Sequence, residues 1–168
     1  RADIRKNLER EVKYRLLGRN KQAVMDALIA KSELDLPKSS VQAELDRMVE
    51  SARADLKQRG VKDADKAPIP DDIFRPQAER RVRLGLVVAE LVRSNELQAK
   101  PEQIKAHVEE LAASYEKPAD VMRWYYSDNK RMAEVEAIVI ESNVTEFVLN
   151  TAKVNAKAIS FDELMGQN

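Results

Sequence analysis

The chain has 168 residues, and its 29 basic and 29 acidic residues cancel to a formal net charge of +0. This balance, with no dense basic run and no apolar stretch near the roughly 20 residues of a membrane span, excludes nucleic acid and membranes as partners and predicts a soluble protein. The lack of cysteine excludes disulfides and thiolate chemistry, and it fits a reducing compartment.

The predicted elements are helices almost throughout, because glycine is rare, charged residues are frequent and alternating β-branched runs are scarce. Apolar residues recur at helical spacing over residues 2–32, which predicts one long amphipathic helix. A second apolar stripe covers residues 41–56, and Gly60 is the residue type that ends a helix in a left-handed cap. Residues 61–69 show no periodicity and are expected to form a loop.

The third predicted helix covers residues 71–95. Its middle, residues 82–92, is apolar on most sides, which indicates the helix that the others pack around. Gly85 is expected to permit a close helix crossing there. Pro76 lies inside the pattern, so the helix either kinks at this proline or begins at it.

The last helices are expected at residues 102–116, 119–127 and 130–153. Residues 157–165 are expected to be extended and to fold back, pinning Phe161 or Leu164 onto the helices, with a disordered tail as the alternative. Four prolines support the helix starts, because the missing N–H of proline costs nothing in a first helical turn. They are Pro37, Pro70, Pro101 and Pro118.

Helix length predicts the shape of this all-α fold. About 30 residues at a rise of ~1.5 Å give a rod of ~45 Å, whereas a compact globule of this size has a radius of gyration of ~15 Å. We therefore expect an elongated multi-helix body from which helical hairpins project, followed by the short extended C-terminal segment.

Aromatic side chains are concentrated in one short region. It contains Tyr115, Trp124, Tyr125 and Tyr126, joined by Val121 and Met122. Three successive aromatics fan across about 200° of a helix, so at least one of them should face outward. Two interpretations stay open: an exposed, adaptable apolar patch, or a corner where two short helices share a small core.

Catalytic and metal sites are not indicated. Adjacent carboxylates such as Glu109 and Glu110 fit a solvated helix face, and no nucleophile or glycine-rich loop accompanies them. His107 is the single histidine, and no cysteine exists to complete a metal site with it. The basic residues at 80–83 fit ion pairing with helix acids better than phosphate binding. We expect no catalytic residue, no metal and no cofactor.

Several segments resemble the C-terminal domain of bacterial trigger factors. They are RADIRKNLERE at residues 1–11, RRVRLGL at 80–86 with Glu90, SNEL at 94–97, YEKP at 115–118 with Trp124 and Tyr125, and FDELM at 161–165. The resemblance is colinear and covers essentially the whole chain.

This resemblance implies an all-helical body with two projecting arms that binds unfolded or nascent polypeptides without ATP, prevents their aggregation and assists folding in the cytoplasm. The positions that correspond to client contacts are Leu111, Tyr115, Val121 and Trp124. With Met122 and Tyr125 of the same cluster, they form the candidate client-binding site. Pro76 and the short polar link at residues 60–67 depart from the family pattern, which bears on the shape of the first arm.

The resemblance also implies what residues 1–168 do not do. The family's ribosome-docking loop (Gly-Phe-Arg-x-Gly-x-x-Pro) and its prolyl isomerase domain have no counterpart here, so the chain is expected to be a single chaperone domain with no enzymatic activity. Contact with the ribosome would occur only through the missing N-terminal domain. The alternative is a helical scaffold or adaptor with one defined protein partner, and the sequence leaves open whether the chain forms a homodimer.

Overall fold

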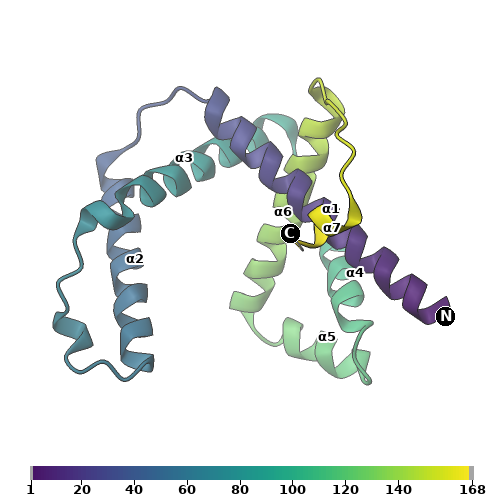
Figure 1. Cartoon of the computed structure of the whole chain (residues 1–168), viewed down its shortest axis with the longest axis horizontal. Helices are drawn as coiled ribbons and strands as arrows, with labels where there is room; N and C mark the ends of the chain where they lie inside the picture. Colours follow the sequence, from purple (N-terminus) through teal and green to yellow (C-terminus); the bar gives the residue numbers. More distant parts are fainter. Residues whose placement is uncertain (1, 167–168) are drawn as a thin grey trace. The chain divides into compact units, whose positions relative to one another are not determined.

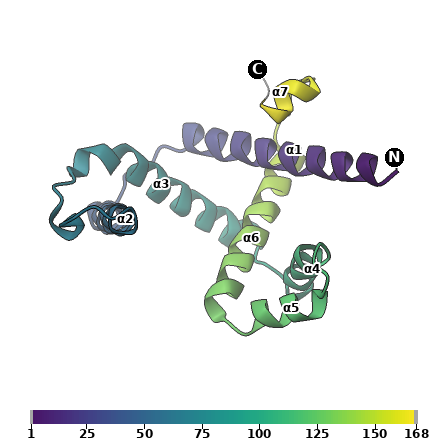
Figure 2. The same cartoon turned by 60° about the horizontal axis from the view of Figure 1, so that its bottom comes forward.

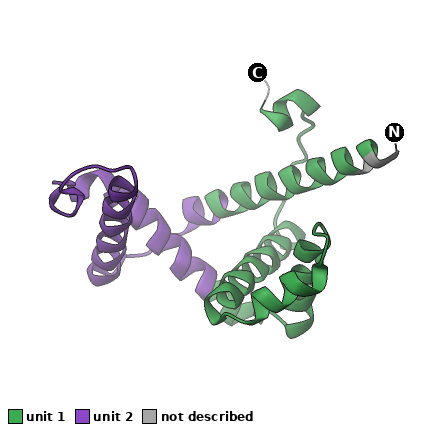
Figure 3. Ribbon diagram, turned by 90° about the horizontal axis from the view of Figure 1, so that it is seen from below, with its two compact units in different colours: residues 1–26, 90–168 green, residues 27–89 purple. Residues whose placement is uncertain are grey.

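The computed structural model describes residues 2–166, and no residue in that range lies in a β-strand (Figure 1). The all-α prediction is therefore confirmed. The elements are α1 (Ala2–Lys31), α2 (Lys38–Gln58), a short 3₁₀ helix η1 (Ala64–Lys66), α3 (Asp71–Asn95), α4 (Pro101–Ala112), α5 (Pro118–Tyr126), α6 (Asn129–Thr151) and α7 (Phe161–Met165). They fall into two compact units (Figure 3). Unit 1 contains the residues up to Asp26 and those from Glu90 onward, and unit 2 is Ala27–Ala89.

Unit 2 is held together by a small apolar core between α2 and α3. Its buried members are Val41, Leu45 and Met48 of α2 and Ala78 of α3. Leu36, Phe74 and Val82 pack against this cluster. The positions 41, 45 and 48, like 74, 78 and 82, fall on one helix face each, so the sequence periodicity determines which faces meet.

Two polar features complete unit 2. The guanidinium of Arg83 donates from Nη1 to the carbonyls of Ser32 and Leu34 at 3.1 and 3.4 Å, which ties the connection after α1 to α3. The C-terminal end of α2 is capped, as predicted, at Gly60, whose φ of 77° is left-handed. The Val61 N–H then donates to the Leu56 carbonyl at 3.0 Å, the bond of a glycine-capped helix end.

The third helix differs from the expectation in its middle. It begins at Asp71, so Pro76 lies inside α3 rather than at its start. No side chain in residues 82–92 is fully buried, and beyond the adjacent residues and the backbone of α3 itself no atom lies within 4 Å of where a Cβ on Gly85 would stand. The predictions of a central helix and of a close crossing at Gly85 are therefore wrong. An apolar helix surface becomes buried only where a neighbouring element covers it. Helical periodicity does not predict how many elements pack against a helix.

Unit 1 contains a bundle of α4, α5 and α6, which contact one another (Figure 2). The buried side chains are Val108 and Ala112 on α4 and Val135, Val139 and Val144 on α6. Helix α4 ends at Ala112, so residues 113–116, expected to be helical, instead form the turn into α5. Pro101 and Pro118 each occupy the start of their helix, as predicted.

A reciprocal amide pair joins α6 to the start of α4. The side chain of Gln103 donates from Nε2 to Oδ1 of Asn143 at 2.8 Å. Asn143 donates from Nδ2 to Gln103 Oε1 at 3.2 Å and to the Leu97 and Gln98 carbonyls at 3.2 and 3.4 Å. The Lys100 N–H also donates to Gln103 Oε1 at 3.0 Å. One side chain of α6 therefore holds the whole connection between α3 and α4.

The end of the chain folds back onto α1 within unit 1. Residues 152–160 form neither helix nor strand, whereas residues 161–165, expected to be extended, form α7. The Ser160 hydroxyl caps this helix by accepting a hydrogen bond from the Glu163 N–H at 3.1 Å. An extended segment would not form this hydrogen bond. An ion pair between Arg19 and Glu163 at 2.9 Å joins α7 to α1. Leu164 is half-buried and Phe161 is exposed, so of these two it is Leu164 that is partly covered.

Candidate functional site

Four of the six predicted client-binding residues come together in one open groove of unit 1. Tyr115, Val121, Trp124 and Tyr125 line a concavity of 370 Å³ together with Asp120. Val121, Trp124 and Tyr125 are spaced i, i+3 and i+4, which places them on one face of α5. The turn that follows α4 brings Tyr115 to the same face. The early end of α4 is therefore what assembles the groove.

The rings of the groove are partly uncovered. Tyr115 is 61% exposed and Trp124 54% exposed, while Val121 and Tyr125 are half-buried. The prediction that at least one of the successive aromatics faces outward is confirmed. No side chain of α5 is fully buried, and the interpretation of the cluster as an adaptable apolar patch stays a prediction.

Leu111 and Met122 lie outside this groove. Both are half-buried, Leu111 near the end of α4 and Met122 on α5, and neither lines the concavity. Met122 follows Val121 directly, so a rotation of 100° along α5 turns it away from the groove-lining face. The structure thus brings together part of the predicted site, and the client-binding role of all six residues stays a prediction.

Trp124 is held by contacts that the sequence analysis missed. Its ring meets the ring of Tyr125 edge-to-face, with centroids 5.0 Å apart and planes at 82°. In a second contact, the guanidinium carbon of Arg131 lies 3.9 Å from the centroid of the Trp124 ring. Arg131 also donates from Nη1 to the Trp124 carbonyl and, at 3.4 Å, to the Ser127 hydroxyl. Arg131 follows Trp124 by seven residues across a helix break, a separation for which sequence offers no contact rule.

Asp120 is the second residue that the sequence analysis missed. It stands one turn before Trp124, and this i, i+4 spacing is a signal that could have placed it beside the cluster. It forms an ion pair with Arg123 on the outer side of α5. The groove therefore has an apolar surface with one carboxylate at its edge.

The break between α5 and α6 is fixed by Asp128. Its carboxylate accepts from the Lys130 N–H at 2.8 Å and from the Arg131 N–H at 3.4 Å, so it caps α6. The Arg131 guanidinium forms an ion pair with it at 3.3 Å. The backbone hydrogen bond from Lys130 is the largest cause that lowers the pKa of Asp128 below its ordinary value of 3.8.

A pH dependence follows from this lowered pKa. The folded state favours the ionised form of Asp128 more than the unfolded state does. Asp128 therefore stabilises the protein above pH 3.8, and this contribution is lost as the pH falls through the lower pKa of the folded state. Asparagine caps helices about as well but does not titrate. We therefore expect the stability advantage of wild type over Asp128→Asn to be constant near neutral pH and to shrink below pH 3.8. Urea unfolding at a series of pH values checks this.

The control for that experiment is Glu136→Gln, which removes one exposed carboxylate from the same helix without touching a cap. An advantage of wild type over Asp128→Asn that persists unchanged into strong acid would contradict the assignment of Asp128 as a charged cap.

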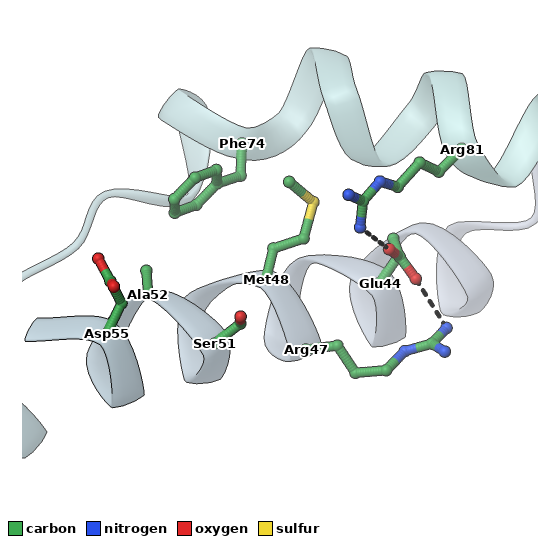
Figure 4. A pocket seen from close by; sticks show the side chains of 8 residues that line it. All are labelled: Glu44, Arg47, Met48, Ser51, Ala52, Asp55, Phe74 and Arg81. Atoms are coloured by element: carbon green, nitrogen blue, oxygen red, sulfur yellow. Dashed lines mark hydrogen bonds and ion pairs between the residues drawn. The ribbon is translucent and has the colours of Figure 1, made fainter. Parts of the chain in front are cut away.

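Unit 2 carries a second concavity, between α2 and α3. Its volume is 600 Å³, and Met48, Ala52 and Phe74 form its apolar floor. In Figure 4, the side chains of Met48 and Phe74 point into the space between the two helices. Charged residues border it, and Glu44 pairs there with Arg81 at 3.0 Å and with Arg47 at 2.8 Å. Met48 belongs to the buried core, and the surface of this concavity is mixed polar and apolar, whereas that of the groove of unit 1 is mainly apolar.

Two features are absent from the described part of the chain, residues 2–166. Within it, no three histidine or acidic side chains gather as metal ligands would. No helix there combines the length and the apolar character that spanning a bilayer requires.

Comparison with known proteins places these features in context. The profile of a family described as bacterial trigger factor protein (TF) C-terminus matches residues 1–150. The curated trigger factor of Polaromonas sp. (strain JS666) is 83% identical over 168 residues, that of Albidiferax ferrireducens 82% over 168, and that of Acidovorax sp. (strain JS42) 80% over 167. These alignments cover 100%, 100% and 99% of this chain, respectively. The chain spans 38% of the length of each of these relatives.

Proposed function

This chain belongs to the family of the bacterial trigger factor C-terminus, and from this premise we propose that it is a chaperone domain that binds exposed apolar segments of unfolded or nascent polypeptides without ATP. The observation that carries the proposal is the groove of unit 1. There, the large aromatic side chains of Tyr115 and Trp124 are both more than half exposed and lie side by side with other apolar residues. An uncovered aromatic groove on a highly charged chain suits apolar segments that have not yet folded.

The mechanism that we propose is passive. Each apolar contact contributes ~25 cal/mol per Å² buried, so a few side chains in an open groove give weak and rapidly exchanging binding. Aromatic and aliphatic side chains accept many client sequences because they do not require a fixed hydrogen-bond pattern. Release follows when the client buries its own apolar residues. The concavity of unit 2 offers a second surface, mixed polar and apolar, for the same purpose.

Further parts of the proposal concern the whole protein. We assign residues 1–168 to one cytoplasmic chaperone domain that catalyses no reaction itself. Ribosome docking and prolyl isomerisation are assigned to regions of the longer relatives that lie outside this match. Measurement of the molar mass in solution tests whether the chain pairs with a second copy.

Suppression of aggregation tests the proposed function. The purified chain is added in several-fold molar excess to a chemically denatured, aggregation-prone protein, and light scattering is followed after dilution. We expect a delay in scattering, and we expect the triple variant Tyr115→Ser, Val121→Ser, Trp124→Ser to lose most of that delay because the groove loses its apolar surface.

The matched control replaces three exposed apolar residues of unit 1 that lie outside the groove. These are Tyr126, Val154 and Phe161, each changed to serine. The control variant should retain the delay. A wild-type chain that leaves the aggregation of several different proteins unchanged would refute the proposed function and favour the adaptor with one defined partner.

A further inference from the structure

The guanidinium of Arg131 lies over the ring of Trp124, the single tryptophan of the chain. The guanidinium carbon lies 3.9 Å from the centroid of the Trp124 ring, within the range of a cation–π interaction. The same guanidinium donates to the Trp124 carbonyl, so it binds both the ring and the backbone of one residue. Such a double contact restrains the orientation of the ring more than packing alone would.

The position of Arg131 is itself fixed. Its side chain is only 27% exposed, and it forms an ion pair with Asp128 at 3.3 Å. Asp128 in turn accepts the first backbone N–H groups of α6. The cap of α6, the guanidinium and the indole therefore form one connected set of contacts across the break between α5 and α6.

The groove lies beside this set of contacts and is not filled by it. Tyr115, Asp120, Val121, Trp124 and Tyr125 line the groove, and Arg131 contacts Trp124 without lining it. The indole stays 54% exposed despite the cation on its ring and the edge-to-face contact with Tyr125. The surface left to a ligand is therefore an indole that is already held in place.

We propose that Arg131 is a positioning residue for client binding: stacked on the indole of Trp124, it preorganises the groove so that aromatic and aliphatic client side chains meet a fixed ring. This inference rests on the proposed function. A surface ordered before binding does not lose side-chain entropy when the client arrives, and preorganisation of this kind raises affinity without adding a contact. Arg131 acts through Trp124 and need not touch the client.

The first test is made on the protein without any client. Because Trp124 is the only tryptophan, all tryptophan fluorescence reports on this ring. Arg131→Gln should lower the steady-state anisotropy of Trp124 and raise its quenching by acrylamide. Arg131→Lys keeps the charge and the pairing with Asp128 but loses the planar stack, so its values should lie between those of wild type and Arg131→Gln. Lys130→Gln removes one exposed positive charge from the neighbouring position and should match wild type.

The second test measures binding of a fluorescein-labelled peptide rich in phenylalanine and leucine and free of tryptophan. Arg131→Gln should weaken its affinity about three- to fivefold, because the client must then order the Trp124 side chain on binding, whereas Lys130→Gln should not weaken it. Circular dichroism confirms that each variant is folded.

The outcomes separate this inference from the proposed function. Unchanged anisotropy and quenching in Arg131→Gln would overturn the positioning role even if the peptide binds. A mobile ring with unchanged peptide affinity would overturn its connection to client binding. If the wild-type chain binds no peptide at all, the proposed function fails, and the role of Arg131 in client binding fails with it.

Discussion

Replacing Leu45 with alanine is expected to lower the free energy of unfolding of unit 2 by about 3 kcal/mol. Leu45 is fully buried, with 0% of its surface exposed, and it lies in a cluster that contains few other large side chains. The substitution removes apolar contacts and leaves a cavity that α2 and α3 can close only in part. In so small a core, one side chain supplies a large share of the packing. Urea unfolding followed by far-ultraviolet circular dichroism measures the change.

Leu86→Ala is the matched control, because it makes the same chemical change on α3 at a side chain that is 39% exposed. It should cost about 1 kcal/mol or less. Hydrogen exchange of α2 locates the effect: amides near Leu45 should lose protection in Leu45→Ala and keep it in Leu86→Ala. Equal losses in the two variants would mean that the α2–α3 core does not stabilise unit 2.

Replacing Asn143 with leucine is expected to lower the free energy of unfolding of unit 1 by about 2 kcal/mol. Leucine has nearly the same shape as asparagine but cannot donate to the carbonyls of Leu97 and Gln98 or exchange hydrogen bonds with Gln103. The Leu97 carbonyl and the Gln103 amide are partly shielded from water, so water replaces their lost partner incompletely. The gain in apolar surface offsets only part of this loss. Thermal unfolding and urea unfolding both measure the difference.

The matched control is Asn150→Leu, which makes the same change at an exposed position of α6. It should alter stability by about 0.5 kcal/mol or less. In Asn143→Leu, hydrogen exchange should also become faster in the first turn of α4, because Gln103 no longer has its partner on α6. If Asn143→Leu proves as stable as Asn150→Leu, the amide pair does not hold the connection between α3 and α4.

The candidate site shows how far sequence reasoning reached. The aromatic cluster was visible in the sequence because its members lie within twelve positions of one another. Spacing on one helix then predicted that at least one of three successive aromatics faces outward, which the exposure of Trp124 and Tyr126 confirms. The contact between Arg131 and Trp124 could not be predicted from the sequence, because it depends on the direction that the chain takes after Ser127.

The sequence by itself determined most of the helices and several of their ends, but not the end of α4 at Ala112 or the formation of α7. Periodicity, proline and Gly60 act through local sterics and local hydrogen bonds, so residues close in the chain suffice to specify the predicted ones. The same holds for the face that α2 turns toward α3, because the positions of Val41, Leu45 and Met48 follow from the helical repeat.

Only the tertiary structure decided which apolar surfaces are covered. Residues 82–92 and Gly85 had the composition of a central helix, yet none of those side chains is fully buried, whereas Val144 of the less conspicuous α6 is completely enclosed. Burial depends on which elements come together in space, and that is set by contacts between residues far apart in the chain, such as the pair of Gln103 and Asn143. Local sequence does not specify such contacts. The groove at Trp124 and the contact of Trp124 with Arg131 were therefore identified only in the tertiary structure.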